Sequence, residues 1–169
     1  MTEDIDIANN TGIANTGYEL GGKLYLFHQT PQKLGADLMQ FIPLVDGDVC
    51  YEPFRGEGAF YDTLPSFVSK DWSEITRGRD YKDYKGSYSV VITNPPFRMP
   101  NEKGVLKNAI FPLLLYFAER ATKCIAFLVS DYGFNSLTPV RIEKLKAFGF
   151  YLHSITTCGV GKWRGRYYF

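Results

Sequence analysis

The sequence predicts an α/β fold with a mostly parallel central sheet flanked by helices. Short apolar runs of the kind that form buried strands alternate along the chain with segments whose apolar residues recur at helical spacing. Strands that alternate with helices in this way form a sheet between helical layers. The chain has 169 residues, of which 45% are hydrophobic. This is enough for one compact core, and a separate recognition domain is not expected.

The first part of the chain is predicted to hold an arm, a strand and a helix. Residues 1–22 are polar and rich in Gly, Asn and Thr without periodicity, so we expect a flexible N-terminal arm before a single domain over residues 23–169. The apolar run at 23–27 indicates a short strand. Thr30 and Pro31 indicate a helix start, with Thr30 as the cap and Pro31 in the first turn. The helical face that follows contains Leu34, Leu38, Phe41 and Ile42.

Strands and helices are expected to alternate over the rest of the chain. Predicted strands occupy residues 48–52, 67–74 and 88–93. The glycine-rich turn at 53–58 is expected to open a helix through about Leu64, and residues 99–104 are expected to be a loop. Beyond that loop the pattern predicts a helix at 105–121, kinked or restarted at Pro112, a buried strand at 123–130, a helix at 137–148 and a final strand pair at 151–158 and 166–169.

Composition argues against several classes of protein. The cysteines and histidines lie far apart, so neither a disulfide framework nor a metal site is expected; they are Cys50, Cys124, Cys158, His28 and His153. No apolar run reaches membrane-spanning length, so we expect a soluble protein of the cytosol of a bacterium, an archaeon or a virus-infected cell. A net charge of +1 gives no general attraction for a polyanion, so nucleic acid would need a local patch.

One such patch lies near the carboxyl terminus. Lys162, Trp163 and Arg164 combine cations with an aromatic ring, the mixture that phosphate contact and base stacking require. These residues are candidates for substrate binding. A solvated hairpin with its aromatic rings in the sheet explains the same residues equally well.

The tetrapeptide Asn94-Pro95-Pro96-Phe97 follows an apolar run at 90–93 and therefore ends a predicted buried strand. Proline fixes φ and lacks the backbone donor, so this turn presents carbonyl groups without competing N–H groups. An acceptor pair beside an aromatic ring suits a planar amine, because the amine hydrogens can be held while the ring stacks on the substrate. A tight turn with Phe97 in the core is the structural alternative.

A second group of candidate residues follows the strand predicted at 48–52. Gly56 and Gly58 let the backbone approach a ligand closely. Tyr61 stands where a dinucleotide fingerprint needs a third glycine, and Glu52 would repel a pyrophosphate. A ligand with both an ammonium and a carboxylate fits better, since Glu52 can pair with the cation while backbone amides near Gly58 hold the anion.

Two more acids extend this interpretation. Glu74 ends the strand predicted at 67–74 and can accept hydrogen bonds from ribose hydroxyls, and Asp80 can accept one from an adenine amine. Strand ends of a parallel sheet can converge on one ligand site. Amino acid, ribose and adenine together indicate S-adenosyl-L-methionine. The structural alternatives are a turn cap for Glu52, a surface acid for Glu74 and membership of a charged loop for Asp80.

These motifs together resemble those of the DNA adenine-specific methyltransferases, which use S-adenosylmethionine and have a Rossmann-like fold. Asn94-Pro95-Pro96-Phe97 resembles their catalytic motif, and residues 52–58 resemble their cofactor motif. The resemblance runs from about Thr30 to the end of the chain, in the family's order. It implies cofactor contacts from Thr30, Pro31, Glu52, Pro53, Phe54, Gly56, Gly58, Glu74, Ile75 and Asp80.

The resemblance also implies a mechanism. Asn94 and the Pro95 carbonyl would each accept one hydrogen of the adenine 6-amino group, which favours a tetrahedral nitrogen with its lone pair directed at the sulfonium methyl. Phe97 would stack on an adenine flipped out of DNA, and Pro96 completes the catalytic motif.

The chain departs from the family in two places. The segment between Glu74 and Tyr88 is too short for the helices and strand that the family has there, so we expect an abbreviated sheet edge after the second strand, with an antiparallel last strand at the other end. Family members with sequence preference often continue beyond the position of Phe169 into a target-recognition region. A recognition subunit or a second copy of the chain is therefore expected to supply DNA contacts.

Three functions remain open. The leading one is methylation of adenine in DNA, in restriction-modification or in a phage. The second is methylation of adenine or guanine in RNA, or of a protein glutamine, whose planar amide suits the same acceptors. The third is a non-catalytic subunit that keeps the fold for binding, although the presence of Asn94 and Glu52 argues against it.

Overall fold

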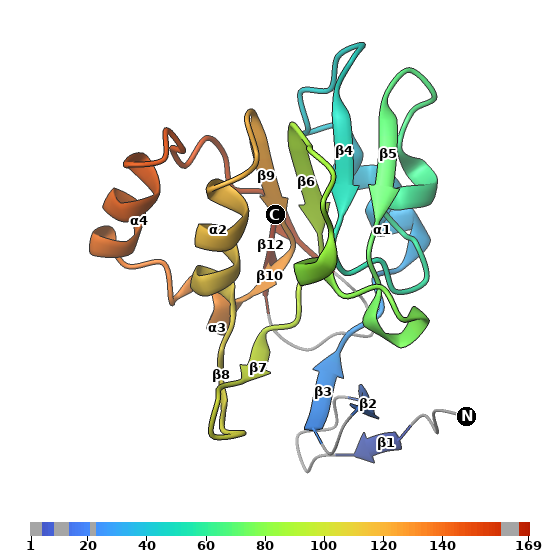
Figure 1. The fold of residues 1–169 in the computed structure, drawn as a ribbon, viewed down its shortest axis with the longest axis vertical. Helices are drawn as coiled ribbons and strands as arrows, with labels where there is room; N and C mark the ends of the chain where they lie inside the picture. Colours follow the sequence, from blue (N-terminus) through green and yellow to red (C-terminus); the bar gives the residue numbers. More distant parts are fainter. Residues whose placement is uncertain (1–4, 9–13, 21–22, 160–165) are drawn as a thin grey trace.

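The computed structural model describes residues 5–8, 14–20, 23–159 and 166–169. Its centre is a four-stranded parallel sheet in the order β5-β4-β6-β9 (Figure 1). The strands are β4 (Val49–Glu52), β5 (Ser69–Trp72), β6 (Val90–Thr93) and β9 (Cys124–Phe127). This confirms the predicted α/β fold, and each strand is shorter than the sequence pattern indicated.

After β9 the chain enters a separate three-stranded antiparallel sheet in the order β10-β12-β11. β10 (Val129–Ser130) follows β9 after Leu128 and pairs with β12 (Tyr167–Tyr168), which also pairs with β11 (Thr157–Cys158). Both pairings of β12 are antiparallel, so the expected antiparallel last strand is confirmed. The strand predicted over 151–158 is confined to its last two residues.

The opposite edge of the sheet is abbreviated, as the short segment after Glu74 predicted. The chain forms two 3₁₀ turns there, η2 (Ile75–Arg77) and η3 (Tyr81–Asp83), and β5 is the outer strand. Tyr84 and Tyr88 stack on Tyr51 of β4, with ring centroids 4.1 and 5.0 Å away. These stacked rings hold the short connection against the sheet.

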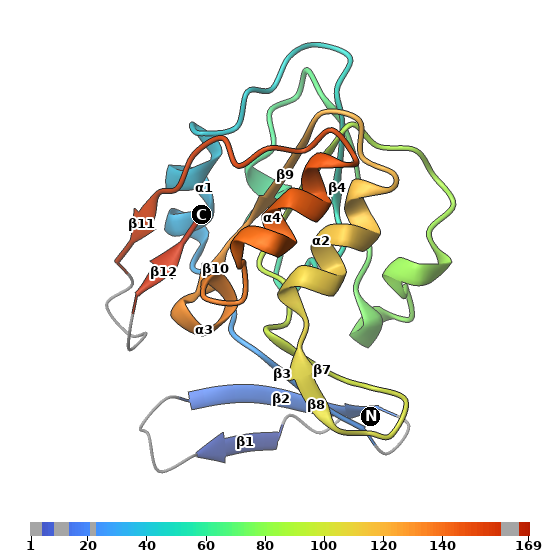
Figure 2. The same cartoon turned by 90° about the vertical axis from the view of Figure 1, so that its left-hand side faces the viewer.

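Helices cover both faces of the sheet (Figures 1 and 2). α1 (Gln32–Met39) lies on one face, and α2 (Ile110–Ala118) lies on the other beside α4 (Pro139–Lys146); a single turn, α3 (Asp131–Phe134), follows β10. Successive residues of a strand point to opposite faces. Alternate residues of β4 and β6 therefore enter two buried clusters, Cys50, Val90 and Ile92 with Leu38 of α1, and Tyr51 and Val91 with Phe117 of α2.

Two predicted helix starts are wrong. Pro31, rather than Thr30, is the N-cap residue of α1, and no side chain caps that helix. The glycine-rich turn leads into a single 3₁₀ turn, η1 (Tyr61–Thr63), instead of a helix. Pro65 explains the early end, because a proline disfavours the helical region for the preceding residue, and Leu64 is extended with ψ 132°.

The segment after the Asn-Pro-Pro-Phe turn also differs from the prediction. Instead of a loop at 99–104 and a helix from 105, the chain forms a hairpin of β7 (Arg98–Pro100) and β8 (Leu106–Asn108). α2 begins afterwards at Ile110, whose N–H donates to Oδ1 of Asn108 at 3.0 Å. Pro112 lies in the first turn, where its missing N–H costs no helical hydrogen bond.

Strands also occur in the segment that was expected to be an arm. Within residues 1–22 lie β1 (Ile5–Ala8) and β2 (Ala14–Leu20), which form an antiparallel sheet with β3 (Lys23–Phe27). The alternation in Ile5-Asp6-Ile7 is the strand signal that the composition of this segment concealed. In Figure 1 this sheet lies beyond the carboxyl ends of the parallel strands. The flexibility of the segment and the single domain at 23–169 remain predictions.

Candidate active site

The predicted site residues follow strands that separate from each other. β4 and β6 pair only as far as Tyr51 and Val91. Each then continues with its outer neighbour, β4 with β5 as far as Glu52 and β6 with β9 as far as Thr93. The order of strands also switches sides here, and open α/β sheets bind ligands at such a point, beyond the carboxyl ends of the strands.

Asn94 follows β6 and is held by the segment between β3 and α1. Its amide nitrogen Nδ2 donates to the carbonyl O of His28 at 2.7 Å and to Oγ1 of Thr30 at 3.1 Å. Its amide oxygen Oδ1 is buried and accepts no hydrogen bond in the described part of the chain. Because a backbone carbonyl can only accept, both amide hydrogens face the protein and the oxygen remains an open acceptor. Buried polar atoms are usually paired, so this open acceptor requires an explanation.

The rest of the predicted catalytic motif combines a carbonyl that accepts no hydrogen bond from another described residue with a partly covered ring. The Pro95 carbonyl accepts no hydrogen bond from another described residue. Phe97 is half-buried and contacts both core clusters, with the rings of His28 and Tyr167 centred 5.8 and 6.3 Å away. Phe97 thus has the predicted core role, and its half-buried position allows contact with a ligand. Pro96, which lies between Pro95 and Phe97 in the chain, is half-buried.

Glu52, the last residue of β4, is 2% exposed. Its Oε2 accepts a hydrogen bond from the Tyr61 N–H at 2.8 Å. Burial raises the pKa of this carboxyl well above its ordinary value, although the Tyr61 hydrogen bond and the Arg55 charge oppose that change. A cation beside the carboxyl would stabilise its charged form. The site therefore suits the ammonium group predicted from the sequence, and that contact remains a prediction.

The glycine-rich turn is folded around side chains from other segments. The Gly56 N–H donates to Oε2 of Glu74 at 2.8 Å, and the Glu57 N–H donates to Oε1 of Gln29 at 3.3 Å. Gly56 has φ +50°, a conformation that favours glycine. A Cβ at this position would also lie 2.7 Å from Gln29 Oε1. The turn therefore requires glycine for its own folding.

The backbone amides expected to hold an anion are mostly paired within the protein. In addition to the two amides above, the Gly58 N–H donates to the carbonyl O of Arg55 at 2.8 Å. Immediately after the turn, the amides of Ala59 and Phe60 donate no hydrogen bond to another described residue. The open donors near Gly58 thus lie one and two residues later than the glycine itself.

Glu74 and Asp80 each cap a turn. Oε1 of Glu74 accepts from the N–H and the hydroxyl of Thr76 at 3.1 and 2.8 Å, while its other oxygen holds the glycine-rich turn. Oδ1 of Asp80 accepts from the Lys82 N–H at 3.0 Å. Ile75 is half-buried at the start of η2. These structural roles are observed, and contacts of the three residues with ribose and adenine remain predictions.

The other predicted cofactor residues differ in accessibility. Pro31 is exposed and Pro53 is fully buried. The Phe54 ring packs against Tyr81 with centroids 5.0 Å apart. The hydroxyl of Thr30 is engaged by Asn94. Their contacts with a cofactor stay predictions.

Arginine side chains surround Trp72 beside the glycine-rich turn. The guanidinium carbons of Arg55 and Arg79 lie 5.2 and 4.1 Å from its ring centroid. Arg55 also pairs with Asp62 at 3.1 Å, and Arg79 pairs with Asp71 at 2.8 Å. Each guanidinium thus has both a ring and a carboxylate as partners, which fixes the edge of the site.

An exposed cation–ring pair lies directly after the Asn-Pro-Pro-Phe turn. The guanidinium carbon of Arg98 lies 4.7 Å from the ring centroid of Tyr132, and both side chains are exposed. Asn108, the cross-strand partner of Arg98, donates through Nδ2 to the carbonyl O of Tyr132 at 3.1 Å. The sequence favoured a rim or core role for Tyr132 over a base contact and gave no sign of its contact with Arg98, because only the hairpin of β7 and β8 brings Arg98 onto its ring.

Other contacts were also missed from the sequence. The His28 carbonyl that binds Asn94 is a backbone group, which no residue pattern can identify. For Gln29 the sequence offered one indication of a role in the site, which is its position next to Thr30. The predicted substrate residues Lys162, Trp163 and Arg164 lie outside the described residues.

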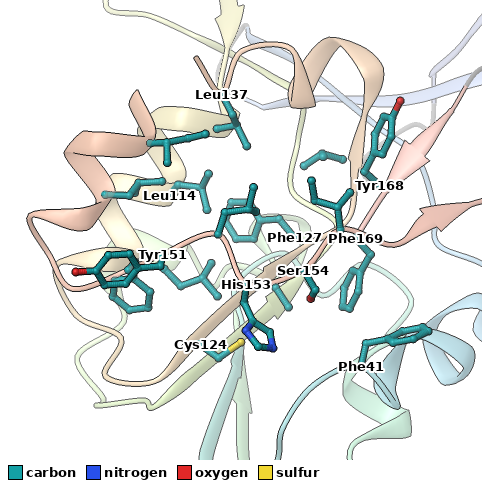
Figure 3. Close-up of a pocket in the computed structure, with 18 of the residues that line it drawn as sticks. Phe41, Leu114, Cys124, Phe127, Leu137, Tyr151, His153, Ser154, Tyr168 and Phe169 are labelled. Carbon is teal, nitrogen blue, oxygen red and sulfur yellow. The ribbon is translucent and has the colours of Figure 1, made fainter. Parts of the chain in front are cut away.

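A separate hollow lies between β9, α2, α4 and the segment at 150–155 (Figure 3). It has a volume of about 490 Å³, and its lining is mainly apolar, with Leu114, Phe127 and Phe169 among the side chains shown in Figure 3. None of the predicted site residues that the structure describes lines it. The polar site at the strand ends and this hollow are therefore distinct regions.

Two further findings concern the described residues only. Within them, no cluster of three or more His, Cys, Asp or Glu side chains has the arrangement of a metal site. Likewise, the helices in these parts of the chain are all too short or too polar to span a bilayer.

Comparisons with known proteins give one structural neighbour. No protein-family model matches the sequence, and no curated protein matches it. The crystal structure of wild-type Trm5b from Pyrococcus abyssi is similar with a TM-score of 0.49 and 14% sequence identity, over 96% of this chain and 55% of that one. The chain thus spans about half the length of Trm5b. The fold assignment rests on the strand order described above.

Proposed function

We propose that this protein is an S-adenosylmethionine-dependent methyltransferase that modifies the exocyclic 6-amino group of adenine in DNA. The observation that carries the proposal is the Asn94 amide, whose two hydrogens are bound by the protein while its buried oxygen has no partner among the described residues. An oxygen in that state can accept a hydrogen bond from an amine without any rearrangement. The resemblance of residues 94–97 and 52–58 to the family's motifs supports the same reaction.

The catalytic motif would prepare the amine for attack. The adenine amine is a weak nucleophile because its lone pair is delocalised into the ring. Asn94 Oδ1 and the Pro95 carbonyl accept its two hydrogens, which favours a tetrahedral nitrogen and frees the lone pair. When bound, S-adenosylmethionine supplies a methyl group on a sulfonium; the new N–C bond forms as the C–S bond breaks, and the amine then releases a proton. No residue needs to remove that proton before attack.

The cofactor residues would hold the amino-acid end of that ligand. Glu52 lies at the end of β4, buried and without a cationic partner within 4 Å among the described residues, and so provides a site for an ammonium group. Ala59 and Phe60 contribute open amides for a carboxylate. Thr30, Pro31, Pro53, Phe54, Gly56, Gly58, Glu74, Ile75 and Asp80 complete the proposed cofactor site.

A nucleic acid is favoured as substrate by the surface next to Asn94. Phe97 provides a ring for stacking on a flipped base. The exposed Arg98–Tyr132 pair lies beside it and offers a phosphate contact and a further aromatic face. Lys162, Trp163 and Arg164 are proposed to extend this surface, in the cytosol and together with a recognition subunit or a second copy of the chain.

The experiment is incubation of the protein with methyl-labelled cofactor and, separately, with DNA, RNA and a glutamine-containing protein. Label in N6-methyladenine of DNA supports the proposal. Label confined to RNA or to protein would replace DNA as the substrate while keeping the reaction. Absence of labelling together with absence of cofactor binding by calorimetry would favour the non-catalytic alternative.

A further inference from the structure

The connection between β3 and α1 contacts both halves of the site. His28 and Thr30 accept the two hydrogen bonds of the Asn94 amide, at 2.7 and 3.1 Å. On the other side Gln29 Oε1 accepts from the Glu57 N–H at 3.3 Å, and Gln32 Nε2 donates to the Glu57 carbonyl at 3.3 Å. Residues 28–32 thus join the amide at the end of β6 to the turn after β4.

We infer that Thr30 is a positioning residue for Asn94, and that its hydroxyl holds the amide in the orientation that the His28 carbonyl selects. The inference rests on the proposed function and deepens it, because the sequence predicted a helix cap or a cofactor contact for Thr30 and no contact with Asn94. Its basis is the pair of contacts to Nδ2 together with Oδ1, which no group in the described part of the chain pairs.

The orientation of the amide follows from the chemistry of its two partners. If the amide turned over, Oδ1 would face the His28 carbonyl at the distance of a hydrogen bond, and two acceptors would repel each other. Thr30 provides the acceptor for the second hydrogen. Without it that hydrogen would be buried and unpaired, and the amide could tilt to find another partner. A tilt of this kind would move Oδ1 away from the substrate amine.

The test replaces the hydroxyl of Thr30 with a methyl group of the same size. We expect Thr30→Val to lower kcat for methyl transfer by about three- to tenfold, the factor expected for loss of one hydrogen bond, with cofactor Kd within about twofold of the parent. Thr30→Ser, which keeps Oγ, should recover most of that loss. Thr138→Val is the matched control, since Thr138 is exposed before α4 and makes no side-chain cap.

If Thr30→Val weakens cofactor binding and leaves kcat unchanged, the inference is overturned, and Thr30 is assigned to cofactor binding instead. An unchanged kcat and Kd would overturn it as well.

A second measurement separates the inference from the proposed function. In urea unfolding, Asn94→Ala and Thr30→Val should be non-additive, because both remove the same hydrogen bond. Additive effects would show that the bond contributes nothing and would overturn the inference even in an active enzyme. The two substitutions could also be non-additive in a protein that transfers no methyl group. That result would support the contact between Thr30 and Asn94 and would reject the proposed reaction.

Discussion

Asn94 and the glycine-rich turn lie on neighbouring strand ends and satisfy their hydrogen bonds in opposite ways. At Asn94 the protein binds the donors and leaves a buried acceptor open. At the turn, acceptors from Glu74 and Gln29 already occupy the backbone donors of Gly56 and Glu57. If the proposed function holds, the first half of the site is arranged for a substrate amine before anything binds. The second half would then use Glu52 and the later amides, or exchange an internal hydrogen bond for one to a ligand.

The largest expected effect is at the open acceptor. Asn94→Ala should lower kcat by at least about 100-fold, the scale seen when one preorganised hydrogen-bonding group is removed from a transition state. Cofactor affinity should remain close to that of the parent, because the turn after β4 is unchanged. Single-turnover label transfer and calorimetry measure the two quantities, and exposed Asn135→Ala is the control. Full activity of Asn94→Ala would remove the mechanism.

Substitution of the buried Glu52 should affect cofactor affinity more than kcat. Glu52→Gln keeps an oxygen for the Tyr61 N–H but removes the negative charge. We expect cofactor Kd to rise by about 10- to 100-fold, as for loss of a hydrogen bond to a charged group, while kcat at saturation changes less. Exposed Glu102→Gln controls for the change in net charge. Unaltered binding by Glu52→Gln would mean that the ligand's cation lies elsewhere.

The packing of α1 on the turn gives a prediction for stability. A Cβ on the buried Gly35 of α1 would clash with the carbonyl oxygen of Ala59. Glycine to alanine within a helix normally stabilises it by up to about 1 kcal/mol, but overpacking costs about 1–3 kcal/mol. Gly35→Ala should therefore lower the free energy of unfolding in urea and raise cofactor Kd. Gly159→Ala, which meets open space, should do neither.

A smaller effect is expected at the exposed pair beside Asn94. Arg98→Ala should raise KM for DNA about two- to fivefold with little change in kcat, since one exposed phosphate contact contributes modestly to affinity. The same variant should flatten the dependence of binding on salt. Lys144→Ala on exposed α4 serves as the control. If DNA binding by Arg98→Ala depends on salt as strongly as binding by the parent protein, the DNA does not contact this hairpin.

The smallest effect concerns pH and the raised pKa of Glu52. A group whose pKa is higher in the folded state binds more protons there, so its contribution to stability is complete below its ordinary pKa of 4.5 and is lost as pH rises through the folded value. The ligand-free protein should thus lose stability over that window, and Glu52→Gln should lose less. Urea unfolding of both proteins at several pH values measures the difference. Equal slopes would indicate that folding does not raise the pKa of the Glu52 carboxyl.

The sequence predicted what depends on local pattern. Apolar runs located all four parallel strands, and the short segment after Glu74 predicted the abbreviated edge. Helix starts were less predictable, because Pro65 ends the segment after the glycine-rich turn early and Asn108 delays α2 to Ile110. These outcomes depend on competition between neighbouring residues rather than on periodicity.

The candidate site rests on residues that the sequence singled out and on contacts that it did not reveal. Asn94 and Glu52 were recognisable because an amide before two prolines and an acid ending a buried strand are chemically unusual. The partners of Asn94 were not, since a carbonyl separated from it by 66 residues leaves no trace in the residue pattern. Likewise Arg98 meets Tyr132 only through the hairpin that the sequence concealed.

The arginine-flanked indole provides an internal optical probe. The sequence contains two tryptophans, so Trp163→Phe leaves Trp72 as the only indole, beside Arg55 and Arg79 at the margin of the glycine-rich turn. Indole emission shifts when nearby charges move. A titration of cofactor against this variant would therefore change the emission spectrum if the ligand is seated after β4, without any label attached to the protein.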